Sequence, residues 1–367
     1  TANTTGGGNT AAGYGALSNN TTSYYNGAFG FNCLVNNTTG SDNNAFGTNA
    51  LATNTTGANN TAMGRDALNS NTTASNNTAV GYNSLKANTT GSENVAVGHQ
   101  TLDANTTGAS NTALGRASLS ANTTANANTA VGESALRFNT TGAYNTAVGG
   151  SSLDANTTAS NNTAVGYGSL GANTTGAYNT AVGKDALLVN TTGGFSTAVG
   201  GSALRLSTGL YNDALGYVAL TANTTGTNNN AFGGGALEAN TTGSSNSAFG
   251  RTALNSNTTA SNNTAVGYKS LYANTTGSYK TAVGYLALSA DTSAGGYKIA
   301  NVAFGGYALG FTTSGESNSA FGTSALENNT TGSNNTAVGT SALDFNTTAS
   351  NNTAVGKDAL RVNTTGV

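Results

Sequence analysis

The sequence has 367 residues but no proline, no tryptophan, and only one residue each of histidine, cysteine and methionine. Charged residues make up 7% of the chain, whereas they make up roughly 25% of ordinary soluble proteins. A single cysteine excludes an internal disulfide, and a single histidine excludes a histidine pair for proton relay or metal binding. The composition also excludes the usual core of large aliphatic residues flanked by charged helix faces.

The shortage of charge also limits the partners that we expect. The formal net charge is −2, and no cluster of lysine and arginine is present that could neutralise several phosphates. We therefore expect no nucleic-acid partner. No run of about 18 apolar residues occurs, so we expect neither a membrane span nor an export signal in this segment. Disorder is not predicted either, because it normally combines low hydrophobicity with high net charge.

The chain consists almost entirely of a 17-residue unit, Asn-Thr-Ala-Val-Gly-x-x-[Ala/Ser]-Leu-x-x-Asn-Thr-Thr-Gly-x-x, which occurs 21 times. We call the glycine that follows Ala-Val, such as Gly81, the repeat glycine. The spacing departs from 17 twice, through a one-residue deletion near 205–212 and a four-residue insertion near 289–300. A fixed period of this kind is typical of a solenoid. We therefore expect residues 1–367 to form a single continuous repeat domain.

Two positions of the unit never vary between copies. An alanine always lies two residues before the repeat glycine, and a leucine always lies four residues after it. In a stack of turns, equivalent residues lie above one another at about 4.8 Å, so each must fit the same cross-section. These residues are therefore predicted to fill the interior, and representative core residues are Ala79, Leu85, Ala96, Leu102, Ala113 and Leu119.

The remaining positions predict strands and corners. Thr-Ala-Val alternates with a period of two, and the segment that ends in leucine is predicted to be a second short strand. The repeat glycine and Asn-Thr-Thr-Gly are predicted corners, and stacked asparagines can form amide ladders. The corner and ladder residues include Gly81, Asn77, Asn88, Asn94 and Asn105. The predicted fold is all-β, a parallel β-solenoid (β-roll) of about 21 turns and on the order of 100 Å long.

The residue just before the repeat glycine is apolar but variable. If alanine and leucine point inward, this residue lines an apolar stripe along the outside, which another copy of the chain would cover. Candidate self-association residues are Val80, Val97, Phe46 and Phe232. The opposite orientation, with this residue inside, stays open at the level of sequence. Unprotected strand edges at the two ends also predict end-to-end growth into filaments.

The repeat resembles the YadA-like head repeat of trimeric autotransporter adhesins, which also occurs in phage tail fibres. Asn-Thr-Ala-Val-Gly-Tyr-Asn-Ser (77–84) and Asn-Val-Ala-Val-Gly-His-Gln-Thr (94–101) carry the resemblance. It implies a left-handed, trimeric β-roll that serves as an adhesin head or fibre shaft. The family unit is typically shorter, and the extra residues here fall around Asn-Thr-Thr-Gly.

Other chemistry has weaker support in the sequence. Asn-Thr-Thr occurs 19 times, and each copy is formally an N-glycosylation site, for example at Asn88, Asn105 and Asn122. Thr78 and its equivalents form one rank of a candidate ice-binding face. No pattern predicts a catalytic residue, a cofactor or a metal site, and Cys33 takes the place of a small core residue.

These observations predict a structural protein rather than an enzyme. The expected role is an extracellular fibre or adhesin shaft, on a cell surface or a virion. The expected partner is the chain itself, in a homotrimer or a polymeric filament, and a host surface or carbohydrate is a further candidate. An ice-binding solenoid and a phage tail-fibre segment are the alternatives.

Overall fold

A computed structural model describes residues 3–364 and 366. It confirms the predicted fold class, an all-β parallel β-solenoid with a 17-residue repeat, and no helix occurs among the described residues. The chain divides into two compact units, Thr1–Asn179 and Thr180–Val367, and each is described by itself. Whether they form one continuous domain stays a prediction.

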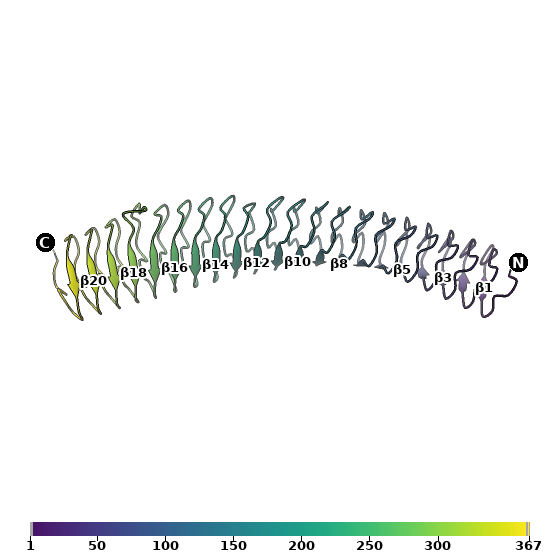
Figure 1. The fold of residues 1–367 in the computed structure, drawn as a ribbon, viewed down its shortest axis with the longest axis horizontal. Helices are drawn as coiled ribbons and strands as arrows, with labels where there is room; N and C mark the ends of the chain where they lie inside the picture. Colours follow the sequence, from purple (N-terminus) through teal and green to yellow (C-terminus); the bar gives the residue numbers. More distant parts are fainter. Residues whose placement is uncertain (1–2, 365, 367) are drawn as a thin grey trace. The chain divides into compact units, whose positions relative to one another are not determined.

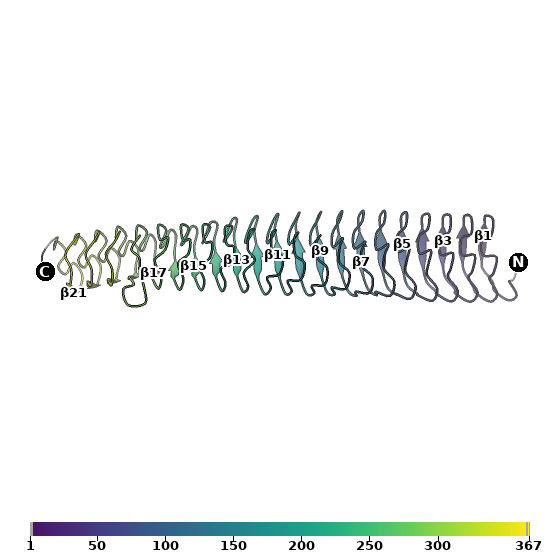
Figure 2. The same ribbon diagram turned by 90° about the horizontal axis from the view of Figure 1, so that it is seen from above.

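Each turn contains one strand of three residues, and Figures 1 and 2 show these strands as successive arrows. The first unit contains β1 (Thr10–Ala12), β2 (Gly27–Phe29), β3 (Asn44–Phe46), β4 (Thr61–Met63), β5 (Thr78–Val80), β6 (Val95–Val97), β7 (Thr112–Leu114), β8 (Thr129–Val131), β9 (Thr146–Val148) and β10 (Thr163–Val165). The second contains β11 (Thr180–Val182), β12 (Thr197–Val199), β13 (Asp213–Leu215), β14 (Asn230–Phe232), β15 (Ser247–Phe249), β16 (Thr264–Val266), β17 (Thr281–Val283), β18 (Val302–Phe304), β19 (Ser319–Phe321), β20 (Thr336–Val338) and β21 (Thr353–Val355).

Within each unit, consecutive strands pair in parallel and without any shift of register. In the first unit, Ala79 of β5 lies opposite Ala62 of β4 and Ala96 of β6. The second unit keeps the same pairing across the insertion, where Ala282 of β17 lies opposite Ala303 of β18. Because side chains alternate along a strand, this register places every middle alanine on the inner side of the sheet.

The invariant alanine and leucine occupy the interior. Ala79 and Leu85 are completely buried, and so are Ala96, Leu102, Ala113 and Leu119. This burial decides the orientation that the sequence leaves open. The middle residue of each strand points inward, and the first and third residues point outward.

The predicted second strand is wrong. The leucine of every turn has a left-handed backbone conformation, with φ +49° at Leu85, and the residue two positions earlier is also left-handed, with φ +55° at Asn83. The segment therefore changes direction repeatedly and cannot extend as a strand. It still bonds to its neighbours, since the Leu85 N–H donates to the Thr101 carbonyl (3.0 Å) and the Asn83 N–H donates to the Arg65 carbonyl (3.1 Å).

A left-handed leucine is unfavourable by itself. The conformation costs about 1–2 kcal/mol for a residue with a side chain. Complete burial of a leucine side chain contributes roughly 1.5–3 kcal/mol. Burial therefore offsets the backbone cost, because this position directs the side chain into the centre of the coil, where Leu85 is fully buried.

Two buried columns of asparagine complete the interior. In the first column, the Asn94 side-chain amide donates to Asn77 Oδ1 (3.2 Å) and to the Gly108 carbonyl (2.9 Å). In the second, the Asn105 amide donates to Asn88 Oδ1 (2.9 Å) and to the same Gly108 carbonyl (2.9 Å). The structure thus contains the amide ladders that the sequence predicts. It also shows that both columns converge on one corner carbonyl in turns that keep both asparagines, as they do at Gly108.

The two length changes lie at corners. In the shortened turn, Ser207 takes the place of the second-column asparagine and accepts a hydrogen bond from Asn223 Nδ2 (3.0 Å). The four extra residues belong to a loop that projects from the second unit beside β17 (Figure 2), and Tyr297 in this loop is exposed. Leu288 and Ala303 on either side of the loop remain buried.

The repeat glycine gives a direct test of this geometry. Gly233 has φ +140°, and a Cβ atom there would lie 2.5 Å from the Gly250 carbonyl oxygen of the next turn, whereas a Cβ on the adjacent Gly234 would meet nothing nearer than 3.8 Å. We expect Gly233→Ala to lower the free energy of unfolding by about 1–3 kcal/mol through backbone strain, with a further loss from the clash. Gly234→Ala should be close to neutral. Guanidinium unfolding followed by circular dichroism compares the two, and equal midpoints would contradict the role of Gly233.

Candidate self-association surface

The outward residues of the strands form two columns on one face of each unit. The threonine column contains Thr78 and its equivalents, and the outer apolar column contains Val80 and its equivalents. Every turn after the first has valine, leucine, methionine or phenylalanine in the outer apolar column. Asp213 is the one charged residue among the described strand residues. The face is therefore continuous within each unit, apolar along one column and uncharged over most of its length.

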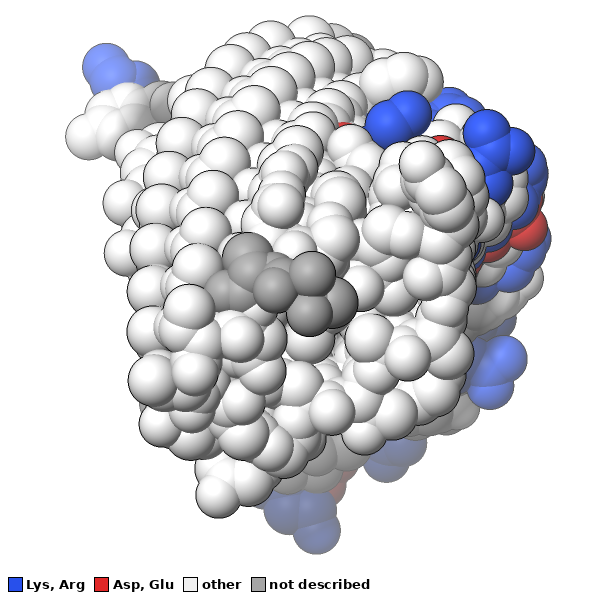
Figure 3. Space-filling view, turned by 90° about the vertical axis from the view of Figure 1, so that its right-hand side faces the viewer, with Lys and Arg blue, Asp and Glu red and all other residues white. Residues whose placement is uncertain are grey.

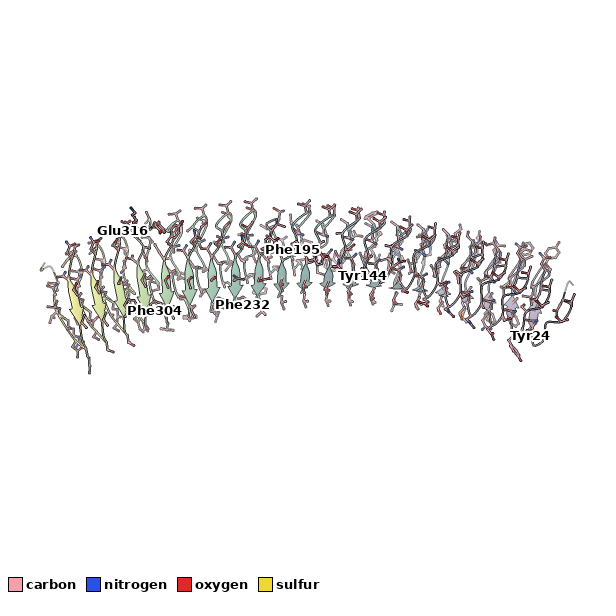
Figure 4. All side chains as sticks on the ribbon, in the orientation of Figure 1. Tyr24, Tyr144, Phe195, Phe232, Phe304 and Glu316 are labelled. Carbon is pink, nitrogen blue, oxygen red and sulfur yellow. The ribbon has the colours of Figure 1, made fainter. Side chains whose placement is uncertain are left out.

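Phenylalanines in the outer apolar column stack on one another. In the first unit, the rings of Phe29 and Phe46 lie 4.8 Å apart and almost parallel. In the second unit, Phe232 stacks on Phe249 at 5.0 Å and Phe304 stacks on Phe321 at 5.3 Å. Figure 4 labels Phe232 and Phe304 on their strands. The spacing follows from the strand register, because neighbouring strands lie about 4.8 Å apart.

The candidate self-association residues all lie on this face. Phe46 and Phe232 are exposed, and Val80 and Val97 are half-buried. A shallow hollow of about 250 Å³ lies beside Phe232, lined by Thr197, Asp213, Ala214, Leu215 and Phe232. It is large enough to accept an apolar side chain from another molecule.

Charged side chains lie on a different side of the coil, mainly at the first, second and fifth residues after the repeat glycine. Figure 3 shows most of the visible lysine and arginine along the right-hand edge, with further groups at the upper left and at the bottom. Several charges pair between successive turns, as in Arg116–Glu133 (2.5 Å) and Arg137–Asp154 (3.0 Å). Burial raises the pKa of Asp154, and Arg137 opposes that shift.

The formal glycosylation sites do not fit the folded chain. Asn88, Asn105 and Asn122 are completely buried. The Nδ2 atom of Asn88 donates to Asn71 Oδ1 (3.0 Å) and to the Gly91 carbonyl (2.9 Å), so both of its hydrogens are in use. An N-linked glycan on these residues would have to break the ladder.

Aromatic residues after the repeat glycine form a second, shorter set of stacks. Tyr14 lies on Phe31 at 5.4 Å, and Tyr82 lies on His99 at 5.3 Å. In the part of the chain that the structure describes, no group of three or more histidine, cysteine, aspartate or glutamate side chains could hold a metal ion. His99 therefore belongs to an aromatic stack and not to a group of metal-binding side chains.

Cys33 lies in the small-residue position before the core leucine and is completely buried. Its thiol donates to the Ala45 carbonyl (3.1 Å), and burial raises the pKa of Cys33 to about 11. The sequence-based interpretation of Cys33 as a substitute for a small core residue agrees with this position.

The thiol is therefore expected to react slowly in the folded protein. At pH 8 the raised pKa leaves a thiolate fraction on the order of a hundredfold below that of an ordinary cysteine, and burial restricts access further. Labelling with a disulfide reagent should be slow in buffer and fast in concentrated guanidinium. Equal rates in the two conditions would show that Cys33 is accessible.

Sequence reasoning missed one pair of residues. Lys280 replaces an asparagine of the first column, and Asp291 replaces the second-column asparagine of the same turn. Both side chains are completely buried, and their charged atoms lie 3.1 Å apart. The sequence did contain a sign of this pair. Both asparagine positions of one turn carry other residues, and that turn lies next to the insertion.

No family model matches the sequence, and no curated protein matches it. Among residues 3–364 and 366, no helix has the length and apolar character needed to cross a membrane.

Proposed function

We propose that the chain is a structural segment of an extracellular fibre or adhesin, and that copies associate through the outer face of the strands. The outer apolar column is the observation that carries the proposal. It is present in nearly every turn, it points away from the core, and charged residues are almost absent from its face.

An exposed column of this kind is unusual for a soluble monomer. Isolated apolar side chains on a surface are normal, but continuous apolar patches larger than a few hundred Å² generally mark an interface. Here the residues form one unbroken row within each unit, and the aromatic pairs are already aligned with one another. A second copy with the same spacing could match this row turn by turn, as symmetric assemblies do.

Substitutions in two different surface columns test this proposal. Phe232 and Phe249 are 36% and 42% exposed on the strand face, and Tyr217 is 71% exposed on the charged side. Changing both phenylalanines to threonine retains strand propensity and removes aromatic area, so self-association should weaken by tenfold or more. Tyr217→Thr should leave self-association unchanged. Sedimentation velocity over a range of concentrations measures both variants. The proposal is overturned if the unaltered chain stays monomeric, or if Tyr217→Thr has the larger effect.

The resemblance to YadA-like head repeats supports the adhesin form of the proposal. Under this reading the fibre lies on a cell surface or a virion, as a homotrimer or a longer filament, and a host surface or carbohydrate is the ligand. A phage tail-fibre segment fits the same resemblance. Electron micrographs of the native material distinguish short rods of fixed width from filaments that grow end to end.

The threonine column favours one alternative function, ice binding. Thr112, Thr129, Thr146 and Thr163 lie directly opposite one another on four consecutive strands of the first unit. They form a regular, uncharged row beside Leu114 and three valines. By contrast, the Thr89 hydroxyl donates to the Thr106 carbonyl (3.0 Å) and is used within the fold.

Ice binding predicts thermal hysteresis and faceted ice crystals in solutions of the unaltered chain. Changing Thr129 and Thr146 to lysine should abolish both effects, because charged, flexible side chains disrupt the row. Freezing at the same temperature as a matched solution of an inert protein would exclude this alternative and leave the structural role.

A further inference from the structure

A lysine, an asparagine and an aspartate meet in the interior of the second unit. Lys280 is completely buried, whereas none of the other five lysines of the chain is buried. Asp291 is also completely buried. A buried ion costs several kcal/mol unless it is paired and hydrogen-bonded, so this turn requires a specific arrangement around the amine.

The contacts of the amine define that arrangement. Lys280 Nζ donates to Asn274 Oδ1 (2.8 Å) and to the Ser293 carbonyl (2.8 Å), and it lies 3.1 Å from Asp291 Oδ1. Asp291 is held in place by the Ser293 N–H (2.8 Å) and by Asn301 Nδ2 (3.0 Å). An amine, a carboxamide and a carboxylate are thus fixed together in a space closed to water.

The positions of these groups suit a reaction between them. A C=O bond is about 1.23 Å long, so the side-chain carbonyl carbon of Asn274 lies no more than about 4 Å from Lys280 Nζ. A reactive approach requires about 3–3.5 Å, which a small side-chain movement supplies. Burial lowers the pKa of Lys280, and Asp291 opposes that shift. Burial thereby favours the neutral amine, which is the nucleophilic form.

We propose that Lys280 and Asn274 become joined by an isopeptide bond that forms spontaneously in the folded chain. The Lys280 Nζ lone pair attacks the Asn274 carbonyl carbon, an N–C bond forms, and the bond from that carbon to Nδ2 breaks. The Asp291 carboxylate accepts a proton from Nζ and passes it to the departing nitrogen, which leaves as ammonia. The reaction is a transamidation and requires no oxidant, reductant or cofactor.

The local sequence explains why the reaction would be confined to this turn. Elsewhere the second-column asparagine receives a hydrogen bond from the asparagine of the next turn, as Asn88 does from Asn105 (2.9 Å). Asp291 has no hydrogen to donate when it is ionised, so Lys280 supplies the donor to Asn274 instead. The bond would restore a link between two turns where the ladder is interrupted, beside the inserted loop.

Intact mass spectrometry of the purified, folded chain tests the proposal. The chain should be lighter than its sequence by one ammonia, and trypsin should fail to cleave after Lys280. Fragmentation of the peptide 270–298 should place the link between Asn274 and Lys280. An unaltered mass would overturn the proposal. A loss of one water would also overturn it, because the bond would then involve Asp291.

Two variants separate the roles of the three residues. Asp291→Asn restores the usual residue of the second column but removes the proton carrier, so the full mass should be regained. Changing both Lys280 and Asp291 to asparagine restores both columns and serves as the matched control for folding, checked by circular dichroism. If Asp291→Asn loses ammonia as readily as the unaltered chain, Asp291 is not the proton carrier.

A cyclic imide at Asn274 also loses ammonia, and it is distinguished by its chemistry. It leaves Lys280 open to trypsin, and hydroxylamine cleaves the chain beside it. Either result in place of a Lys280-linked peptide would overturn the isopeptide assignment.

Discussion

The fold depends on one repeated interaction, in which two buried asparagines donate to the same corner carbonyl. In one turn, Asn77 and Asn88 both donate to the Gly91 carbonyl, at 3.0 and 2.9 Å. A buried amide without partners costs roughly 1–3 kcal/mol in proteins, so an interior with many asparagines is stable only if each of them finds hydrogen-bond partners. The ladder therefore fixes the corner in each turn and demands a nearly constant period.

The left-handed leucines follow from that constraint. With the corners fixed by the two asparagine columns, the chain has only a few residues in which to turn back toward the next strand. Left-handed residues at Asn83 and Leu85 make this turn, and the buried leucine offsets the cost of its own conformation. The inner alanine of each strand is buried in the same interior and, being small, takes up little of it. The two invariant residues are thus parts of one packing solution.

Much of the interior could be predicted from the sequence, because a stack forces equivalent residues to share one environment. Ala79, Leu85 and the asparagine columns were identifiable on this basis alone. The second strand was predicted wrongly, because a sequence does not show that a leucine will adopt a positive φ. The glycosylation motif at Asn88 gave no sign that this asparagine is buried, since a three-residue pattern contains no information on burial. The sequence left the outward column undecided, and only the burial of the inner alanine settles its direction.

The shared carbonyl links the two asparagines of a turn, and in two turns both of them change together. Ser196 and Ser207 replace both asparagines of one turn, and Lys280 and Asp291 replace both of another. In a third turn, Thr312 alone replaces the second-column asparagine. Lys280 Nζ donates to the Ser293 carbonyl much as Asn77 donates to the Gly91 carbonyl, so the pair keeps the corner closed by different chemistry. Residues outside the two asparagine columns do not share a corner carbonyl, so they can vary independently of one another. The outer apolar column can therefore range from alanine to phenylalanine without disturbing the fold, and its apolar character fits the proposed contact with another copy of the chain.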